Sequence, residues 1–222
     1  MILCRVQSSP VSELVPYPRA KRALDKSVAG ALTLLCAPVV AGVVFAMGVD
    51  MALSRRDRGP WFYRERRISR GREFDLLKFR TLRREVLERD GVAGHVRLFE
   101  SEADNLTWTG RRLLKPWYLD ELPQLLNVLR GEMSLVGPRP WPVSMVDAQV
   151  SAGLDYRTRV VAGWTGPAQV QKGITEPAGY TTLDLAYVDA CRSWSWRRLL
   201  GYDLRILVET VKVIARGEGL SY

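Results

Sequence analysis

The sequence predicts a small, mostly helical α/β globular domain with an N-terminal re-entrant membrane helix and interfacial amphipathic helices. Three observations lead to this fold class. An uncharged apolar run extends from Val28 to Val49, short strand-like segments are interspersed with helical leucine patterns after it, and an amphipathic pattern beside tryptophans lies near the C-terminus. The 222 residues, 47% hydrophobic and 26% charged, are typical of one folded domain and exclude a wholly disordered chain.

Net charge and the scarcity of cysteine and histidine limit the classes of function. The chain has 33 Lys and Arg against 24 Asp and Glu, a formal charge of +9. This charge favours an anionic partner: nucleic acid, an anionic membrane surface or a phosphorylated substrate. The three cysteines, Cys4, Cys36 and Cys191, lie far apart, and His95 is the single histidine. We therefore expect no disulfide framework, no zinc site and no histidine-based nucleophilic catalysis.

The apolar run from Val28 to Val49 predicts a membrane segment that bends. As a continuous helix it would be roughly 33 Å long, enough to cross a hydrocarbon core. Pro38, in its middle, lacks an N–H and predicts a break. Basic residues, which prefer the cytoplasmic side, flank both ends: Arg19, Lys21, Arg22 and Lys26 before the run, and Arg55, Arg56 and Arg58 after it. A re-entrant hairpin satisfies both flanks, and a single Pro-kinked span is the alternative.

This segment divides the chain into three parts. They are an N-terminal segment over 1–20, a re-entrant helix–break–helix over 21–54 and a globular domain over 55–222. The apolar run starts too late for a signal peptide, and no cleavage site of small residues followed by a polar mature sequence is evident after it.

The first part of the globular domain predicts strands and turns. Gly59-Pro60 is a turn signal before a short strand at Trp61-Phe62-Tyr63. Arg70-Gly71-Arg72 predicts another turn, and Phe74–Phe79 predicts a strand or an edge segment. The charge-dense stretch Arg83–Arg97 has no strong period, so we expect a solvated helix or a mobile loop there.

A helix is predicted next, because leucines recur at helical spacing up to Gly131, a natural C-terminal stop. These leucines are Leu119, Leu122, Leu125, Leu126 and Leu129. Gly137-Pro138-Arg139-Pro140 predicts a rigid loop, and Gly163, Gly166 and Pro167 predict a second loop.

The C-terminal region predicts an amphipathic helix. Its apolar residues are Leu199, Leu200, Leu204, Ile206, Leu207, Val211 and Ile214, and basic residues accompany them. Trp194 and Trp196 precede the helix. Tryptophan beside arginine favours a membrane–water interface, and core packing with a solvated opposite face is the alternative.

Asp120 and Glu121 are the strongest candidates for chemistry. They open the leucine helix just before Pro123, where the helix dipole favours an ionised carboxylate. An ionised aspartate can act as a nucleophile, and the adjacent glutamate can hold Mg²⁺ beside a substrate phosphate. The alternative is structural: Asp120 caps the helix and Glu121 suits its first turn.

Four cations on short, turn-bounded segments accompany this carboxylate pair. Lys78 and Arg80 belong to Lys78-Phe79-Arg80-Thr81, Lys115 lies five residues before Asp120, and Arg139 lies between two prolines. Cations that converge on a carboxylate pair are suited to bind a phosphate beside a negative nucleophile. For any one of them, a solvated basic surface is the alternative.

An ordered set of motifs carries a family resemblance. In chain order they are Lys21-Arg22-x-x-Asp25, the apolar run broken at Pro38, Gly59-Pro60-x-Phe62-Tyr63-x-x-x-Arg67, Lys78-Phe79-Arg80-Thr81, Leu119-Asp120-Glu121-Leu122-Pro123-Gln124-Leu125, Asn127-Val128-Leu129-x-Gly131-x-Met133-Ser134, Val136-Gly137-Pro138-Arg139-Pro140 and Gly163-x-Thr165-Gly166. With them the sequence resembles the bacterial sugar transferases, monotopic polyprenyl-phosphate phosphoglycosyl transferases, from about Lys21 to the C-terminus.

The resemblance implies a membrane enzyme with a two-step reaction. Asp120 would attack the β-phosphorus of a UDP-sugar and release UMP, and polyprenyl (undecaprenyl) phosphate would then take the phosphosugar from Asp120. Glu121 would coordinate Mg²⁺, Lys115 and Arg139 would bind phosphate or nucleotide groups, and Lys78 and Arg80 would line the same site.

The resemblance also implies a location and a pathway. The enzyme would be monotopic on the cytoplasmic face of the bacterial inner membrane, in contact with membrane lipid, and would initiate glycan or exopolysaccharide assembly. Pro38 would form the break of the re-entrant helix.

Two other functions compete with this one. The chain departs from the family pattern at Lys115, where arginine is usual, and after Gly166, which motivates a catalytically impaired, membrane-anchored binding protein of the same fold. The charge alone motivates a nucleic-acid-binding module. Because the cations are not interleaved with a stacking platform, we expect no nucleic acid as a functional partner.

Overall fold

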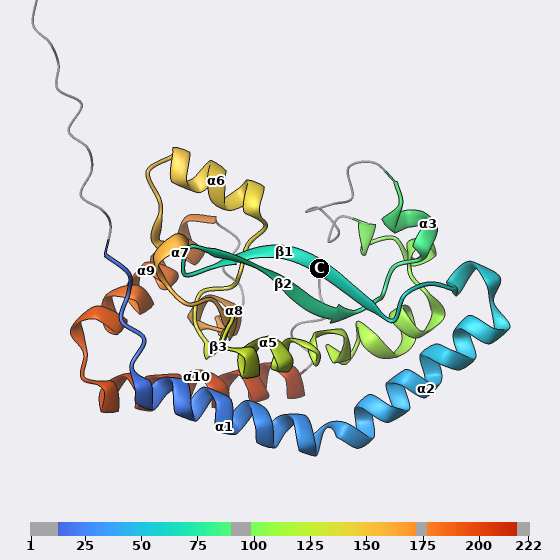
Figure 1. Cartoon of the computed structure of the whole chain (residues 1–222), viewed down its shortest axis with the longest axis horizontal. Helices are drawn as coiled ribbons and strands as arrows, with labels where there is room; N and C mark the ends of the chain where they lie inside the picture. Colours follow the sequence, from blue (N-terminus) through green and yellow to red (C-terminus); the bar gives the residue numbers. More distant parts are fainter. Residues whose placement is uncertain (1–12, 90–98, 172–176, 217–222) are drawn as a thin grey trace, which may run out of the picture.

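The computed structural model describes residues 13–89, 99–171 and 177–216, and it is mostly helical with two small sheets (Figure 1). The helices are α1 Arg19–Leu35, α2 Ala37–Leu53, α3 Arg84–Leu87, α5 Gln124–Arg130, α6 Val143–Ser151, α7 Tyr156–Arg159, α8 Pro167–Val170, α9 Pro177–Ser193 and α10 Trp196–Ala215. Short 3-10 turns are η1 Arg55–Asp57, η2 Ala103–Asn105 and η4 Leu119–Glu121, and Gly110–Leu114 forms a π-helical turn, η3. The strands are β1 Phe62–Ser69, β2 Arg72–Phe79, β3 Ser134–Val136 and β4 Gly163–Thr165.

The predicted strands form an antiparallel hairpin. Phe62 lies opposite Phe79, and Ser69 lies opposite Arg72. The predicted turn is confirmed: Arg70 and Gly71 have φ values of 51° and 73°, the left-handed conformation that two-residue hairpin loops use. The first strand is longer than the predicted Trp61–Tyr63. It continues through four consecutive charged residues because a strand places alternate side chains on opposite faces.

One side chain of helix α5 forms hydrogen bonds with two backbone groups on the edge of β2 that does not pair with β1. Asn127 is fully buried; its Oδ1 accepts from the Leu77 N–H at 3.1 Å, and its Nδ2 donates to the Asp75 carbonyl at 2.8 Å. An amide can satisfy both backbone groups of an edge strand at once, since it carries a donor and an acceptor. The predicted stop of this helix is confirmed, because Gly131 adopts φ 80°. Asn127 therefore fixes α5 against β2.

The stretch Arg83–Arg97 is only partly described. Arg84–Leu87 forms the short helix α3, and residues 90–98 lie outside the described residues. Val86 of α3 is buried with Leu82 and Leu106 in a small apolar cluster of its own. The described half of the stretch therefore includes one helical turn with a buried side.

The apolar segment is a pair of helices bent by 55° (Figure 1). The break lies at Cys36, two residues before Pro38, and Pro38 belongs to the first turn of α2. This position differs from the expected one because proline interrupts the preceding turn but is tolerated at the start of a helix. Among the described helices, none alone has the length and hydropathy needed to cross a membrane, and the bent pair meets those criteria together.

Each arm of the bent pair is attached to the globular domain by a buried carboxylate. On α1, Asp25 accepts from Ser134 Oγ at 2.7 Å. On α2, Asp50 accepts from the Thr109 N–H at 2.9 Å and from Thr109 Oγ1 at 2.8 Å. These two aspartates bracket the apolar run, so the pair packs on the domain at both ends.

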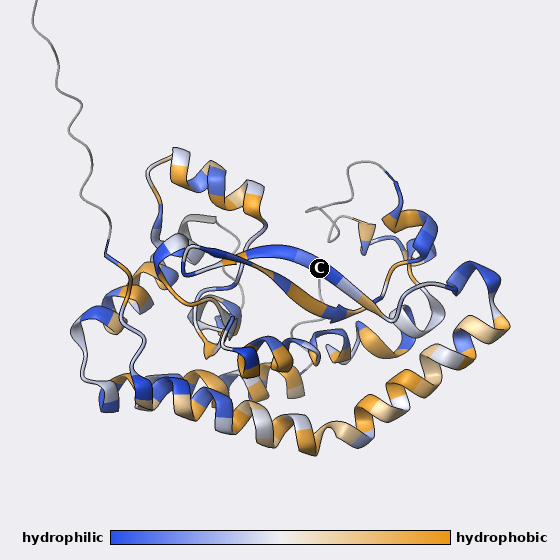
Figure 2. Cartoon of the chain, viewed as in Figure 1, coloured by the Kyte–Doolittle hydropathy of each residue, from blue (hydrophilic) through white to orange (hydrophobic). Residues whose placement is uncertain are grey.

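Helix α10 is amphipathic, as predicted, and lies beside α1 (Figure 1). Asp203 of α10 forms a 2.6 Å ion pair with Lys21 of α1, and Leu199 and Ile206 are buried in the main core. Its other face exposes Leu204, Val208, Val211 and Ile214. Apolar side chains exposed on the bent pair include Leu34, Leu35, Phe45 and Leu53, and Figure 2 shows this hydrophobic character along α2 and the adjoining end of α1.

The second half of the domain contains a parallel strand pair that the sequence did not predict. Ser134 pairs with Gly163, and Val136 pairs with Thr165. Residues 163–165 are therefore strand β4 and not a loop, whereas Gly137–Pro140 is a loop as predicted. Three-residue strands carry too little periodic pattern to be recognised, and here the pairing partner decides the conformation.

We expect Asn127→Ala to lower the free energy of unfolding by about 2–5 kcal/mol, since two buried backbone groups lose their partners. The measurement is urea denaturation of the detergent-purified protein followed by circular dichroism. Arg130→Ala, an exposed position on the same helix, is the control and should change stability by less than about 0.5 kcal/mol. Equal stabilities of the two variants would contradict the role of Asn127.

Candidate active site

Asp120 and Glu121 lie in a 3-10 turn that precedes helix α5. The turn begins after Tyr118, which adopts a left-handed conformation with φ 54°, and α5 itself starts at Gln124. The Asp120 side chain makes no capping hydrogen bond. The structural alternative, in which Asp120 caps the helix, is therefore wrong, because α5 begins only after Pro123. Leu122 and Pro123, between this turn and α5, also have right-handed helical dihedral angles, so Asp120 lies about one turn before the start of α5.

Glu121 faces two cations from different parts of the chain. Its Oε1 lies 3.0 Å from Arg139 Nη2 and 3.7 Å from Lys78 Nζ. Burial opposes ionisation of this carboxyl, but the positive charges of Arg139 and Lys78 prevail and lower its pKa to about 2. Glu121 is therefore ionised at neutral pH, and its side chain is 15% exposed.

Asp120 is more deeply buried and is paired with a shared lysine. Lys115 Nζ lies 3.4 Å from Asp120 Oδ2 and 2.6 Å from Glu100 Oε2. Burial raises the pKa of Asp120, and the charges of Lys115 and Lys78 act in the opposite direction. The charged form of Asp120 is therefore favoured by the neighbouring lysines and opposed by burial.

The loop that carries Arg139 is held by close backbone packing. A Cβ at Gly163 would lie 2.1 Å from the Gly137 nitrogen, and one at Gly166 would lie 2.2 Å from the Gly137 oxygen. These glycines allow the two chains to approach and form their backbone hydrogen bonds, such as the one from the Gly137 N–H to the Thr165 carbonyl at 2.9 Å. Arg157 adds a hydrogen bond from Nη1 to the Arg139 carbonyl at 2.6 Å.

Arg80 does not join this cluster. Its side chain is buried, and its guanidinium donates to the backbone carbonyls of Pro60, Leu82 and Asp57 at 2.7, 2.7 and 2.5 Å. A guanidinium whose donors are directed at carbonyls is a structural crosslink between loops. The expectation that Arg80 lines the phosphate site is corrected accordingly, while Lys78, Lys115 and Arg139 do converge on Asp120 and Glu121.

Three further residues support the site and were missed as candidates. Glu100 forms an ion pair with Lys115, and Arg157 donates a hydrogen bond to the Arg139 carbonyl. Arg67 Nη1 donates to the Pro140 carbonyl at 3.2 Å. Arg67 belongs to a motif that carries the family resemblance, so a signal for it was present. Glu100 and Arg157 have no local pattern, because their contacts join segments that are distant in sequence.

The six ionisable groups at the centre are balanced in charge. Lys78, Lys115 and Arg139 face Asp120, Glu121 and Glu100, so the cluster is neutral when all six groups are ionised. The described residues contain no group of three or more His, Cys, Asp and Glu that could hold a metal ion. An ionised Glu121 still fits Mg²⁺, which is often bound by one or two carboxylates together with substrate phosphates. The arrangement can therefore offer a carboxylate nucleophile beside a place for a metal-bound diphosphate.

Comparison with known proteins decides the family. The family model described as bacterial sugar transferase matches residues 17–217. This chain belongs to the bacterial sugar transferase family.

Curated members of the bacterial sugar transferase family are similar over most of this chain. A UDP-glucose:undecaprenyl-phosphate glucose-1-phosphate transferase of Caulobacter vibrioides is 36% identical over 208 residues, which cover 88% of this chain and 72% of the relative. The exopolysaccharide production protein ExoY of Rhizobium meliloti is 34% identical over 90% of this chain and 87% of its own length. The galactosyl transferase CpsE of Streptococcus agalactiae is 31% identical over 90% of this chain, which spans only 43% of that relative.

We expect Gly163→Ala to lower the free energy of unfolding by more than about 2 kcal/mol, because its Cβ would overlap the Gly137 backbone. The measurement is urea denaturation in detergent. Gly201→Ala in α10 is the control: a Cβ there meets nothing within 4 Å, so this variant should be neutral or more stable by up to about 1 kcal/mol. A Gly163→Ala protein as stable as wild type would refute the close packing beneath Arg139.

Proposed function

We propose that this bacterial sugar transferase moves a phosphosugar from a UDP-sugar to polyprenyl (undecaprenyl) phosphate through a covalent aspartyl intermediate. The observation that carries the proposal is the pairing of buried Asp120 with ionised Glu121, both in contact with cations. The printed activity of the Caulobacter relative, from UDP-glucose to undecaprenyl phosphate, supports the class of donor and acceptor.

In the first step, a carboxylate oxygen of Asp120 attacks the β-phosphorus of the UDP-sugar. The new bond joins this oxygen to phosphorus, and the bond from the β-phosphorus to the bridging oxygen breaks. That oxygen leaves with its electron pair as part of UMP. Lys115, at 3.4 Å, supports the ionised form of Asp120 before attack, and it is placed to contact phosphate oxygens afterwards.

In the second step, a phosphate oxygen of the polyprenyl phosphate attacks the same phosphorus. The bond between Asp120 and phosphorus breaks, the carboxylate is restored, and polyprenyl-diphospho-sugar is released. A covalent intermediate allows a water-soluble donor and a lipid-confined acceptor to react in turn at one site. The product would initiate glycan or exopolysaccharide assembly, and the printed name of the Rhizobium relative supports that role.

Glu121 is the residue proposed to hold Mg²⁺. When bound, the ion supplies positive charge that neutralises the diphosphate. Arg139 and Lys78, which contact Glu121 without substrate, would then be available for the phosphate oxygens. This exchange of partners is consistent with the balanced charge of the cluster.

We also propose a monotopic location on the cytoplasmic face of the inner membrane. The bent pair α1–α2 would enter and leave one leaflet, with the exposed faces of α2 and α10 against lipid. The 55° bend, the exposed apolar side chains and the basic residues on both flanks support this arrangement. It would hold the reacting groups near the headgroup level, where both substrates can meet.

We expect Asp120→Asn to reduce UMP release by more than about 10³-fold and to abolish covalent labelling by the UDP-sugar. The assay measures UMP over a panel of UDP-sugars with polyprenyl phosphate and Mg²⁺. Asp147→Asn, an exposed position on α6, is the control and should retain activity. Normal turnover by Asp120→Asn would refute the nucleophile, and absence of UMP from wild type with every donor would favour the binding-protein alternative.

We expect Glu121→Gln to raise the Mg²⁺ concentration needed for half-maximal UMP release by at least about tenfold, because a neutral amide is a weaker ligand for a hard cation. The measurement is a Mg²⁺ titration at saturating donor. Glu209→Gln, an exposed change of the same kind on α10, is the control. An unchanged titration for Glu121→Gln would rule out metal binding by this residue.

A further inference from the structure

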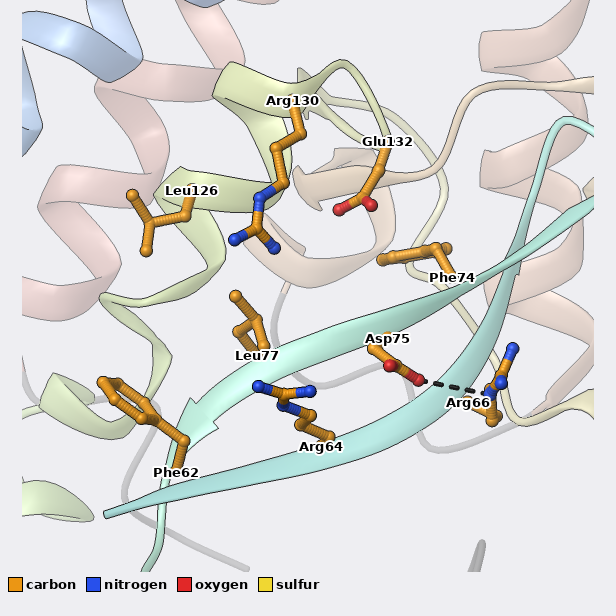
Figure 3. Close-up of a pocket in the computed structure, with 9 residues that line it drawn as sticks. All are labelled: Phe62, Arg64, Arg66, Phe74, Asp75, Leu77, Leu126, Arg130 and Glu132. Atoms are coloured by element: carbon orange, nitrogen blue, oxygen red, sulfur yellow. Dashed lines mark ion pairs between the residues drawn. The ribbon is translucent and has the colours of Figure 1, made fainter.

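A cavity lies between the hairpin and α5, outside the candidate active site described above. It is open to solvent and has a volume of about 470 Å³ (Figure 3). Phe62, Leu77 and Leu126 contribute apolar surface, and Arg64 and Arg130 are among the basic residues that line it. Phe62 and Leu126 are 45% and 38% exposed, so a large part of this apolar surface is uncovered.

The cavity and the candidate active site lie on opposite faces of the hairpin. Leu77 lines the cavity, whereas the next residue, Lys78, reaches Glu121. Successive side chains of a strand point to opposite faces, so a molecule in the cavity is separated from Asp120 by the sheet. The cavity is therefore not part of the proposed donor or acceptor site.

Two arginines in the cavity have no partner within the described residues. Figure 3 shows the guanidinium groups of Arg64 and Arg130 directed toward the same space on either side of Leu77. Within the part of the chain that the structure describes, neither side chain forms a hydrogen bond or an ion pair. Two cations that face one cavity repel each other unless an anion lies between them.

The acidic residues of the cavity already have partners. Asp75 Oδ1 lies 3.2 Å from Arg66 Nε, and Glu132 Oε2 accepts from Asn127 Nδ2 at 2.6 Å. Arg66 is paired with Asp75 and with Glu73 at 3.5 Å. Asn127 is a neutral partner, so Glu132 keeps its negative charge, and the three arginines and two carboxylates that line the cavity give it a net charge of +1. The charge of the cavity is therefore complementary to an anionic group, while its apolar surface is complementary to a hydrocarbon.

The two elements that form the cavity, the β1–β2 hairpin and α5, both contact the bent helix pair through neighbouring residues. Trp61, directly before Phe62, packs on α2, where a Cβ at Gly48 would lie 3.4 Å from its ring. Leu129 of α5 packs on α1, where a Cβ at Gly30 would lie 3.9 Å from Leu129 Cδ2. The elements that form the cavity are thus in contact with α1 and α2, which expose Leu34, Leu35, Phe45 and Leu53 elsewhere on their surfaces.

We propose that this cavity binds one anionic phospholipid, with its phosphate between Arg64 and Arg130 and its hydrocarbon on Phe62, Leu77 and Leu126. An amphiphile matches both properties of the cavity. Its phosphate can pair with the arginines, and its hydrocarbon can cover the exposed apolar side chains. A free phosphate would leave the apolar wall uncovered. The inference rests on the membrane association proposed above but not on the transfer chemistry.

The test is native mass spectrometry of the detergent-purified full chain titrated with anionic phosphatidylglycerol or with zwitterionic phosphatidylcholine, whose net charge is zero and which should bind more weakly. Arg64→Gln/Arg130→Gln should bind the first phosphatidylglycerol at least about tenfold more weakly than wild type. Arg111→Gln/Arg112→Gln removes the same charge from exposed positions outside the cavity and should bind like wild type. Because the readout is lipid binding, a failure of UMP release does not affect it.

Two further measurements make the result specific. Leu126→Gln should weaken phosphatidylglycerol binding, and glycerol 3-phosphate should compete poorly, since it lacks hydrocarbon. Equal binding of phosphatidylglycerol by the Arg64→Gln/Arg130→Gln protein, with an unchanged circular dichroism spectrum, would overturn the proposal. Competition by glycerol 3-phosphate or UMP as strong as that of the lipid would also overturn it, in favour of a soluble phosphate ligand.

Discussion

The rest of the structure depends on one constraint: the backbone groups on the unpaired edge of β2 require hydrogen-bond partners. A two-stranded hairpin leaves backbone donors and acceptors without partners, and the Asn127 amide satisfies two of them at Leu77 and Asp75. Because both the oxygen and the nitrogen of this amide are hydrogen-bonded to β2, the distance of α5 from the strand and its position along the strand are both fixed. Its preceding turn then lies beside Lys78, and its end at Gly131 leads directly into β3. The carboxylates of the candidate active site, Asp120 and Glu121, are therefore positioned by a helix that is itself fixed to a strand edge.

At the candidate active site, burial and charge oppose each other at adjacent residues with different results. Burial prevails at Asp120 and raises its pKa, whereas Arg139 and Lys78 prevail at Glu121 and lower its pKa to about 2. The difference follows from partners: Glu121 has a 3.0 Å contact with a guanidinium, and Asp120 has a 3.4 Å contact with a lysine that Glu100 shares. Two neighbouring carboxyls with divergent pKa values are suited to different roles in one reaction.

The bent helix pair is part of the domain and not an appendage to it. Asp25 and Asp50 anchor its two arms to Ser134 and Thr109, and Lys21 of α1 is paired with Asp203 of α10. Their burial leaves the opposite surfaces of α2 and α10 apolar and exposed. Helices α1 and α2 therefore contact the elements that form the lipid cavity, while α2 and α10 offer an exposed hydrophobic surface.

Local pattern determined the features that depend on neighbouring residues. These are the turn at Arg70 and Gly71, the stop at Gly131, the amphipathic helix α10 and, through ordered motifs, the family and the residues that cluster at Asp120. Tertiary contacts decided the remainder: the break at Cys36, the pairing of β3 with β4, the capture of Arg80 by three carbonyls, and the pairing of Lys115 with Glu100. The physical reason is that periodicity and turn chemistry act over a few residues, whereas burial and hydrogen-bond partners come from segments far along the chain.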